Sequence, residues 1–363
     1  MRVMLLVTDL ERGGTPLRLA RLARGLREAG VQVSVGCLAP PGPVSAALAQ
    51  AGISTFACGA RGSWDLRAFW RLGRYVRRLR PELIHATLTH ANVAARLVGR
   101  LCRVPVLTST ATIEVERRWH RWAEVLTARL DRGHIVNGTA VAEHVVRAFH
   151  LPRERVFLLP PSVDAIASRP EREAARSALG IRQDEFVVLW AGRLDPVKRV
   201  DLVVKCAEIM SSLPVRFLIA GDGPDRPRIE QAARRSPAAH VLHCLGWRDD
   251  LPALMAAADV LLLTSRTEGL PNIVLEAMAA GLPVVASDIP SLRELAGHQQ
   301  RLVLVRGADA AGFAGVLQHL RDDPAGRAAL AVRAANWAAG NLQPDATVAA
   351  ALSVYREVLG RGG

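Results

Sequence analysis

Short apolar runs alternate with amphipathic stretches along all 363 residues of the chain. Apolar runs in the first half predict strands at 2–8, 31–37, 53–57, 82–86, 104–109, 133–137 and 156–159. Helical periodicity lies between them, for example at 14–29 and 65–79. The second half predicts further strands, each followed by a helical segment, at 186–192, 216–223, 240–246, 259–265 and 282–288. Repeated βα units predict an α/β protein with parallel sheets covered by helices.

The stretch 164–185 is polar and charged and shows no strand pattern. It is therefore the predicted linker between two Rossmann-like domains, one over 1–165 and one over 166–345. The last helix, over 346–363, has no strand after it and is predicted to pack back on the first domain. Ligands of open α/β sheets bind at the carboxyl ends of the strands. Two such sheets facing across a cleft would bring the loops after their strands to one site.

Positive charge is concentrated in the first domain. Residues 1–165 hold 24 arginines and 12 acidic residues, and so carry +12 of the formal net charge of +13. A pI near 10.9 is compatible with a basic nucleic-acid-binding protein. The arginines are spread through enzyme-like βα units with no recognised binding module, so we expect no nucleic acid as partner. The five cysteines include no CxxC pair, which argues against a zinc site or a disulfide framework and suits a cytoplasmic protein.

Two segments of the first domain, 61–81 and 114–132, mix arginine with tryptophan. Such segments can lie on an anionic bilayer, where each basic residue contributes about 1 kcal/mol. The alternative is a pair of ordinary helices with the apolar side on the sheet and the arginines in water. No run approaches the roughly 18 apolar residues of a spanning helix. Together with the charge, the two segments favour a peripheral position on the inner face of the membrane.

The segment AGRLDPVKRVD, 191–201, follows a predicted strand and precedes a helix. Arg193 and Lys198 would therefore lie at the carboxyl end of the strand, beside a helix N-terminus. A guanidinium fork and a compact ammonium group suit a pyrophosphate, and Lys198 is one of only two lysines in an arginine-rich chain. The alternative is a solvated loop in which these cations pair with Asp195 or Asp201.

The segment TEGLPNIVLEAMAAGLPVVASD, 267–288, carries two glutamates around a predicted helix start. Glu268 follows a strand, and the backbone after it would form an anion site at the helix N-terminus. Glu276 lies about one turn further along, where its carboxylate could accept hydrogen bonds from vicinal hydroxyls such as those of a ribose. The alternative makes both glutamates partners of the helix dipole, which explains an acid in the first turn but not Glu276 among apolar neighbours.

These motifs together resemble a known family. EGLPNIVLEAMAAGLPVVASD, with glutamates at 268 and 276, is similar to the E-x7-E signature of glycosyltransferase family 4 (group 1), whose members have the GT-B fold. The resemblance extends to AGRLDPVK, to IAGDGP at 219–224, to LGWRDDLPALMAAADVLLLTS at 245–265 and to SVD at 162–164. In the first domain it is looser and covers GG at 13–14 and ELIHATLTHAN at 82–92.

The resemblance implies roles for matching positions. Arg193 and Lys198 would hold the diphosphate of the donor and stabilise the leaving nucleotide, and Glu268 would face the donor sugar; these three form the implied catalytic set. Glu276 would bind the ribose. The full donor-binding set is Gly13, Gly14, Arg193, Lys198, Gly246, Trp247, Glu268, Gly269, Leu270, Pro271, Asn272 and Glu276. Within it, the two glycines after the first strand would allow close approach to the diphosphate or sugar, and the Gly246–Trp247 loop would lie near the nucleobase.

One departure concerns the first domain. Many relatives place a histidine after the fifth strand, whereas this chain has TSTATIE at 108–114. The hydroxyls of Ser109, Thr110 and Thr112 are predicted to contact a sugar or acceptor in its place. His85 and His90 are present in the preceding strand-to-helix turn, where a satisfied or exposed histidine is the more ordinary interpretation.

We therefore expect a retaining, metal-independent hexosyltransferase with no cofactor besides its nucleotide-sugar donor, a UDP-sugar being favoured. A DxD motif is absent from the loops that would bind a metal. The sugar would be a hexose or N-acetylhexosamine, and the acceptor a glycan or lipid-linked glycan in polysaccharide or glycolipid biosynthesis. The alternatives are a catalytically silent GT-B scaffold and a basic nucleic-acid-binding protein. A nucleotide-dependent dehydrogenase is disfavoured, because no GxGxxG follows a strand.

Overall fold

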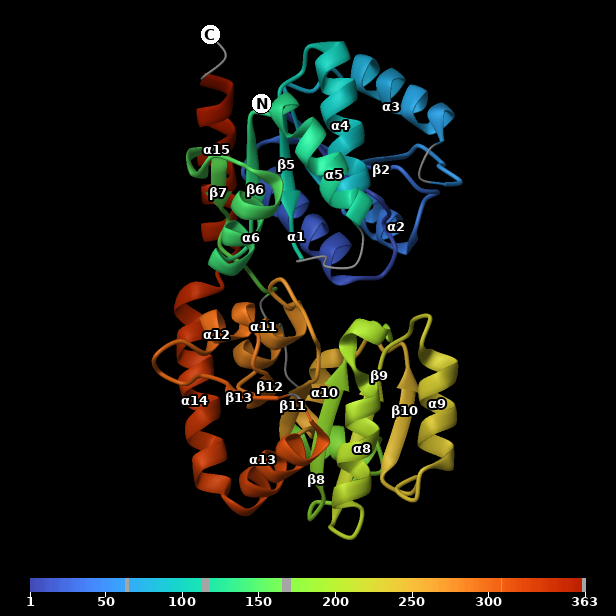
Figure 1. Cartoon of the computed structure of the whole chain (residues 1–363), viewed down its shortest axis with the longest axis vertical. Coiled ribbons are helices and arrows are strands. Elements are labelled where there is room, and N and C mark those ends of the chain that lie inside the picture. The colour runs from blue at the N-terminus through green and yellow to red at the C-terminus, as the bar shows by residue number, and fades with distance from the viewer. Residues whose placement is uncertain (63–64, 113–117, 165–170, 308, 361–363) are drawn as a thin grey trace. The chain divides into compact units, whose positions relative to one another are not determined.

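The computed structural model describes residues 1–62, 65–112, 118–164, 171–307 and 309–360 (Figure 1). The chain divides into two compact units. The first consists of Met1–Ser162 and Gln343–Gly363, and the second of Val163–Leu342. The C-terminal segment thus belongs to the same unit as the N-terminus.

The first unit is built on a seven-stranded sheet with the order β3-β2-β1-β4-β5-β6-β7. Every neighbouring pair is parallel. The strands are β1 (Arg2–Val7), β2 (Gln32–Cys37), β3 (Ser54–Ala57), β4 (Leu83–Thr87), β5 (Val106–Thr110), β6 (Gly133–Val136) and β7 (Val156–Leu158). All seven match the strands predicted from apolar runs. The direction of growth reverses between β1 and β4, so the switch point lies there.

Helices cover both faces of this sheet. They are α1 (Gly14–Glu28), α2 (Pro43–Gln50), α3 (Leu66–Leu79), α4 (Thr89–Cys102), α5 (Arg118–Thr127), α6 (Thr139–Phe149) and α15 (Pro344–Gly360), with short 3-10 turns η1 (Ala128–Leu130) and η2 (Arg153–Arg155). Alternate side chains of β1 point to opposite faces. Val3 and Leu5 pack with residues of α1, α2 and α15, whereas Met4 and Leu6 pack with residues of α3 and α4.

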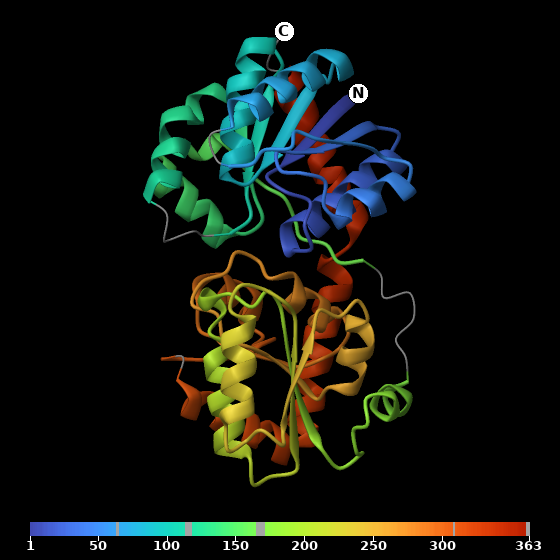
Figure 2. The ribbon, with the colours of Figure 1, turned by 90° about the vertical axis from the view of Figure 1, so that its right-hand side faces the viewer.

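Helix α15 packs against α1 in the first unit (Figure 2). Tyr355 is fully buried, and its hydroxyl lies 2.7 Å from Nδ1 of His85 on β4. A Cβ on Gly25 would lie 2.4 Å from Cγ2 of Val348, so glycine permits this close contact between the two helices. The last helix is therefore an integral part of the core of the first unit.

The second unit is built on a six-stranded parallel sheet with the order β10-β9-β8-β11-β12-β13. Its strands are β8 (Phe186–Ala191), β9 (Val215–Ala220), β10 (Leu242–Gly246), β11 (Val260–Leu263), β12 (Val284–Ser287) and β13 (Val303–Val305). Strand β13 was not predicted from the sequence, although the apolar run LVLV at 302–305 marks it. The α/β class with two parallel sheets is confirmed.

The helices of the second unit also form two layers. Helices α7 (Arg172–Ala178), α10 (Leu251–Ala257), α11 (Asn272–Ala279), α12 (Pro290–Ala296) and α14 (Pro324–Asn341) contribute to one core cluster. Helices α8 (Val200–Met210), α9 (Arg226–Arg235) and α13 (Ala310–Asp322) contribute to the other. A 3-10 turn, η3 (Pro196–Lys198), precedes α8.

The prediction of a linker over 164–185 is wrong for most of this segment. Helix α7 packs against α10 of the second unit. Its Arg176 is buried, donates to the carbonyl oxygen of Ala257 and binds Oδ2 of Asp259 at 2.7 Å. Charge misled the prediction here, because a distant carboxylate allows this arginine to be buried. Residues 165–170 of the predicted linker lie outside the described residues.

Candidate functional site

The sequence motifs of the second unit converge on its switch point. Strands β8 and β11 are neighbours, and the sheet grows from them in opposite directions. The loop after β8 carries Arg193 and Lys198, and the loop after β11 carries Glu268. Residues 70 positions apart in the chain are thus brought to adjacent strand ends, the position at which open α/β sheets bind ligands.

Lys198 and Glu268 form a direct ion pair. The Lys198 Nζ lies 2.6 Å from Oε1 of Glu268, which also accepts a hydrogen bond of 2.6 Å from Ser265 Oγ. The Glu268 side chain is only 6% exposed, whereas that of Lys198 is 23% exposed. The pair therefore has a buried anion and a cation that still reaches water. The sequence left open an ion pair between Lys198 and Asp195 or Asp201. In the structure Lys198 pairs with Glu268 instead.

Backbone contacts join the two loops that form the pair. Thr264 Oγ1 donates to the carbonyl oxygen of Lys198 at 2.8 Å, and the Arg266 N–H donates to the carbonyl oxygen of Val197 at 2.9 Å. Ser291 Oγ donates to the carbonyl oxygen of Glu268 at 3.2 Å. The geometry of the ion pair is consequently set by the backbone as well as by the charges.

Arg193 is the most accessible cation of this loop. Its side chain is 70% exposed, and Nε lies 4.0 Å from Oδ2 of Asp195. Asp195 also accepts a hydrogen bond from the Val197 N–H, which caps η3. An exposed guanidinium at this distance from a carboxylate forms a weak pair, so its donors remain available to an anion in solution.

The loop after β8 is supported from the loop after β9. The N–H of Gly192 donates to the carbonyl oxygen of Ala220 at 3.0 Å, and that of Leu194 to the carbonyl oxygen of Asp222 at 2.8 Å. Gly221 and Gly223 have φ of +149° and +156°, and Cβ atoms there would lie 1.8 and 2.3 Å from the carbonyl oxygens of Gly192 and Leu194. The two glycines of IAGDGP therefore allow the two loops to approach closely.

Helix α11 places Glu276 near the same strand ends. The helix begins at Asn272, with Pro271 in the N-cap position, and Glu276 is its fifth residue. Its neighbours Val274, Leu275, Ala277 and Met278 are buried, whereas Glu276 is partly exposed. The carboxylate is therefore directed away from the apolar core, and its position among apolar residues in the sequence does not make it a buried charge. Gly269, Leu270 and Pro271 form the buried approach to this helix.

Gly246 and Trp247 lie at the end of β10, two strands from β8. The carbonyl oxygen of Gly246 accepts a 2.7 Å hydrogen bond from the Gly221 N–H. The indole Nε1 of Trp247 donates to Oδ1 of Asp249 at 2.8 Å. The loops after β8, β9 and β10 are thus linked in series by backbone hydrogen bonds.

At the switch point of the first unit, Gly13 precedes α1 and Gly14 begins it. Gly13 has φ −173°, and a Cβ there would meet only Pro16 Cδ at 3.7 Å. Neither backbone conformation nor packing within the described chain thus requires glycine at this position. On the adjacent strand end, Leu88 adopts φ +77° and ψ 145°, a conformation that L-residues rarely take. Such strain is concentrated at functional sites.

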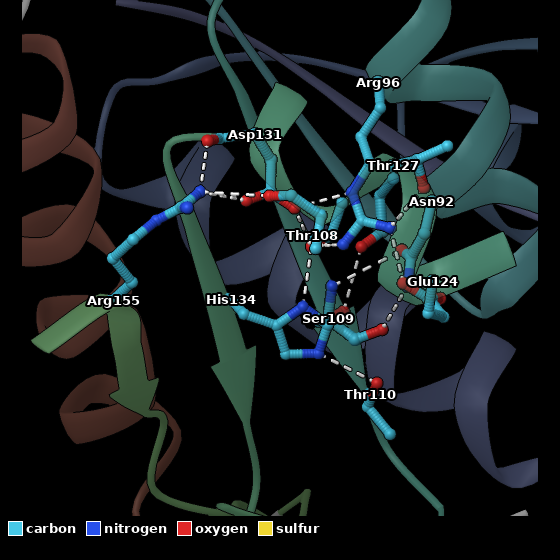
Figure 3. Close-up of polar contacts among 12 residues, drawn as sticks. Asn92, Arg96, Thr108, Ser109, Thr110, Glu124, Thr127, Asp131, His134 and Arg155 are labelled. Atoms are coloured by element: carbon cyan, nitrogen blue, oxygen red, sulfur yellow. Dashed lines mark hydrogen bonds and ion pairs between the residues drawn. The ribbon is translucent and has the colours of Figure 1, made fainter. Parts of the chain in front are cut away.

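A buried polar network, which sequence reasoning did not identify, lies beneath the loop after β5 (Figure 3). Arg96 of α4 is fully buried; its Nε donates to Asp131 at 2.6 Å, and its Nη1 donates to Glu124 at 2.5 Å. Asp131 also binds Arg155 Nη2 at 2.8 Å. The positive charges of two arginines therefore balance the negative charges of two carboxylates. Nothing in the local sequence distinguishes Arg96 from the exposed arginines around it.

The histidines and hydroxyls of the first unit have varied surroundings. His85 is buried against Tyr355, and burial lowers its pKa to about 4. His90 on α4 makes edge contacts with the rings of Trp119 and His120. Ser109 Oγ is buried and bonded to Thr87 Oγ1 at 2.7 Å.

The other two hydroxyls predicted to contact substrate differ from Ser109. Thr110 is partly exposed at the end of β5 and bonded to His134, and Thr112 is exposed. The structure therefore directs the Ser109 hydroxyl inward, whereas Thr110 and Thr112 are residues with solvent-exposed surface. The end of the TSTATIE loop, from residue 113, lies outside the described residues.

Two family models match this chain and together cover most of it. The model "Glycosyltransferase Family 4" matches residues 12–165, and "Glycosyl transferases group 1" matches residues 185–323. The first match lies in the first compact unit apart from its last residues, and the second lies within the second unit.

Curated relatives and solved structures agree with these models. A D-inositol 3-phosphate glycosyltransferase of Thermobispora bispora is 32% identical over 62% of this chain and 56% of its own length. A UDP-Gal:alpha-D-GlcNAc-diphosphoundecaprenol alpha-1,3-galactosyltransferase of Escherichia coli is 24% identical over 71% of both chains. The chain spans about half the length of the first curated relatives that it matches. HepE of Anabaena, solved in complex with UDP and glucose, has the same fold, with a TM-score of 0.87, 20% identity, and coverage of 98% of this chain and 100% of that one.

Proposed function

Because the chain belongs to glycosyltransferase family 4 (group 1) and has the GT-B fold, we propose that it transfers a hexose or N-acetylhexosamine from a nucleotide sugar, with retention of configuration. The observation that carries the proposal is the Lys198–Glu268 pair at the switch point of the second sheet, with Arg193 exposed beside it. A UDP-sugar is the favoured donor, since the Escherichia coli relative is described with UDP-Gal.

The proposed donor site follows from the charges at the strand ends. Arg193 supplies an exposed guanidinium fork for the diphosphate, and Lys198 a single charge whose direction is fixed by Glu268. These cations would stabilise the leaving diphosphate without a metal. The partly exposed Glu276 would accept hydrogen bonds from the ribose hydroxyls. Gly13, Gly14, Gly246 and Trp247 keep the roles that the resemblance implies.

In the proposed reaction, the bond between the anomeric carbon and the diphosphate oxygen breaks while the acceptor oxygen bonds to the same carbon from the same face. The departing phosphate oxygen takes the proton of the acceptor hydroxyl, so charges and atoms balance. Glu268, whose Oε2 accepts no hydrogen bond from any residue that the structure describes, would present that oxygen to the donor sugar. The acceptor would be a glycan or lipid-linked glycan, in line with the diphosphoundecaprenol acceptor of the Escherichia coli relative.

Nucleotide binding tests the proposal directly. UDP, GDP, ADP and their common sugars are screened for an increase in the melting temperature of the protein, because a ligand that binds only the native state stabilises it. Arg193→Ala should abolish the shift. Arg182→Ala is the matched control, since Arg182 is comparably exposed, at 65%, and pairs with a nearby aspartate. No shift with any nucleotide in folded protein would contradict the enzyme and favour the scaffold.

Two further variants separate binding from chemistry. Glu276→Ala should weaken donor binding by removing a ribose contact. Lys198→Ala should mainly slow transfer, because the leaving diphosphate gains charge in the transition state. Steady-state kinetics and nucleotide binding measure both. Normal turnover in both variants would contradict the placement of the site.

A peripheral membrane position is proposed from the surface of the first unit. Helices α3, α4 and α5 lie side by side over one sheet face. Large apolar side chains on them are exposed, namely Leu66 at 80%, Trp70 at 67%, Leu101 at 71%, Trp122 at 59% and Leu126 at 76%. These helices contain one acidic residue, the buried Glu124, among many exposed arginines. Apolar tips among positive charge, with the one acidic residue of these three helices buried, suit an anionic lipid surface.

No described helix is long and apolar enough to cross a bilayer. Vesicle co-sedimentation therefore tests surface binding, with phosphatidylglycerol-containing vesicles compared with pure phosphatidylcholine. Replacement of both Trp70 and Trp122 by serine should release the protein from the anionic vesicles. Serine at Ile209 and Val332, exposed apolar residues of the second unit, should not. Equal sedimentation of the wild type with both vesicle types would refute an electrostatic membrane surface.

A further inference from the structure

A chain of hydrogen bonds runs through the buried network to the carboxyl edge of the first sheet (Figure 3). Asp131 Oδ2 lies 2.7 Å from Thr108 Oγ1, which lies 2.7 Å from Nδ1 of His134. Nε2 of the same ring lies 2.9 Å from Thr110 Oγ1. Thr108 and Thr110 lie on the same face of β5, opposite His134 and Val136 of β6. The chain therefore links a fully buried carboxylate to a partly exposed hydroxyl.

The donors in this chain can be assigned by elimination. The Asp131 carboxylate, bound by both Arg96 and Arg155, only accepts, so the single hydrogen of the Thr108 hydroxyl is donated to it. Thr108 Oγ1 accepts from Arg96 Nη2 at 3.0 Å, and its remaining lone pair accepts from the His134 ring. His134 therefore carries its hydrogen on Nδ1.

The assignment determines the state of Thr110. With the hydrogen on Nδ1, Nε2 of His134 has only a lone pair, so the Thr110 hydroxyl must donate to it. Burial, followed by the positive charge of Arg96, lowers the pKa of His134 well below its ordinary value, and the ring stays neutral. The oxygen of Thr110 consequently has lone pairs to offer and no hydrogen left to donate.

Thr110 lies at the edge of the first sheet where ligands of open α/β sheets bind. It is the last residue of β5 and is partly exposed at the carboxyl edge, where open α/β sheets bind ligands. Asn137 Nδ2 donates to the carbonyl oxygen of Ala111 at 3.0 Å, which holds the backbone immediately after it. Thr112, two residues further on, is exposed, and the structure shows no hydrogen bond from its hydroxyl to the described residues. Of the hydroxyls of Thr110 and Thr112, only that of Thr110 is oriented by the network.

We propose that Thr110 is a sugar-binding residue whose oxygen, oriented by His134, accepts a hydrogen bond from a sugar hydroxyl of the substrate. The inference rests on the proposed glycosyl transfer and adds a contact from the first unit. The sugar can belong to the donor or to the acceptor, and the experiment separates the two.

The test compares Thr110→Val, which keeps the shape and removes the oxygen, with Thr110→Ser, which keeps the oxygen. Thr55→Val is the matched control, because Thr55 is partly exposed on the edge strand β3 of the same unit. UDP-glucose, UDP-galactose and UDP-N-acetylglucosamine are first compared with UDP for binding, and transfer is then measured to an alkyl glucoside. We expect Thr110→Val to lower kcat/KM by about tenfold or more, because the substrate hydroxyl loses its acceptor, and Thr110→Ser to restore most of it.

The source of the sugar follows from the pattern of the loss. A donor contact weakens binding of the sugar nucleotide but leaves UDP binding unchanged, whereas an acceptor contact raises only the KM for the glucoside. Unchanged constants in Thr110→Val, or an equal loss in Thr55→Val, would overturn the assignment. A wild-type protein that binds no nucleotide sugar would overturn the proposed function and the assignment with it.

Nitrogen NMR of the His134 ring supplies a readout independent of activity. The wild type should show the Nδ1–H tautomer, and Thr110→Val should shift the Nε2 resonance while leaving Nδ1 protonated. A ring with its hydrogen on Nε2 would contradict the orientation of the Thr110 hydroxyl. This measurement separates a failure of the hydrogen-bond chain from a failure of the proposed function.

Discussion

Replacing Gly221 by alanine tests whether the proposed donor site depends on the close approach of two loops. Gly221 has φ +149°, and a Cβ there would lie 1.8 Å from the carbonyl oxygen of Gly192. Cβ atoms essentially never approach closer than 3.0 Å, so the two loops must separate by more than about 1 Å. Gly192 immediately precedes Arg193, so the displacement would fall on the exposed cation of the site.

The magnitude can be built from two contributions. Forcing a residue with a side chain into this backbone conformation costs about 1–3 kcal/mol. The two backbone hydrogen bonds that join the loops contribute about 1 kcal/mol each if they are lost. With both hydrogen bonds lost, the expected destabilisation is therefore about 3–5 kcal/mol. A misplacement of about 1 Å in a catalytic site costs on the order of 100-fold in rate, so kcat/KM should fall by about that factor.

Gly180→Ala is the matched control within the same unit. Gly180 also has a positive φ, +63°, but a Cβ added there would meet no atom within 4 Å. It should therefore show only the backbone cost, about 1–2 kcal/mol, with normal activity. Denaturant unfolding and UDP titration calorimetry measure both variants. If Gly221→Ala unfolds like Gly180→Ala and binds UDP as tightly as the wild type, the close loop contact does not shape the site.

Two further predictions concern the first unit. Arg96→Met leaves Glu124 buried without its cation and Asp131 with only Arg155, and should lower the free energy of unfolding by about 3–5 kcal/mol. Arg147→Met, on an exposed ion pair, should change it by less than about 1 kcal/mol; denaturant titrations measure both, and equal losses would contradict this ranking. Burial lowers the pKa of His85 from 6.5 to about 4, so the unfolded chain takes up this proton first. The lowered pKa of His85 therefore contributes about 3 kcal/mol to the free energy of unfolding. This contribution is present above pH 6.5 and is lost as the pH falls toward 4. An NMR titration with a His85 pKa near 6.5 would refute this, as would a pH dependence of unfolding that His85→Gln leaves unchanged.

The pattern of apolar positions was sufficient to predict most of the fold. All strands except β13 were predicted close to their observed bounds, because the runs that form buried parallel strands are continuous and local. Helix α7 was missed because the polar composition of its segment resembles a linker. Its Arg176 can be buried only because Asp259, 83 residues away, lies opposite it. No local pattern records that pairing.

The donor motifs were equally visible in the sequence, since Arg193, Lys198, Glu268 and Glu276 lie in short segments of distinctive composition. The arrangement of these four residues in space was not visible in the sequence. That Lys198 binds Glu268 depends on the adjacency of β8 and β11, which the order of strands in the chain does not specify.

The buried network of the first unit was not visible in any part of the sequence. Arg96 resembles the other arginines of a basic domain until α4, α5 and the β5–β6 edge enclose it. The sequence by itself determined the elements and the residue types at the strand ends, because local periodicity and loop composition act over a few residues. Only the tertiary structure decided which charges are paired and which hydroxyl is oriented, because hydrogen bonds and burial depend on side chains that are distant in the chain.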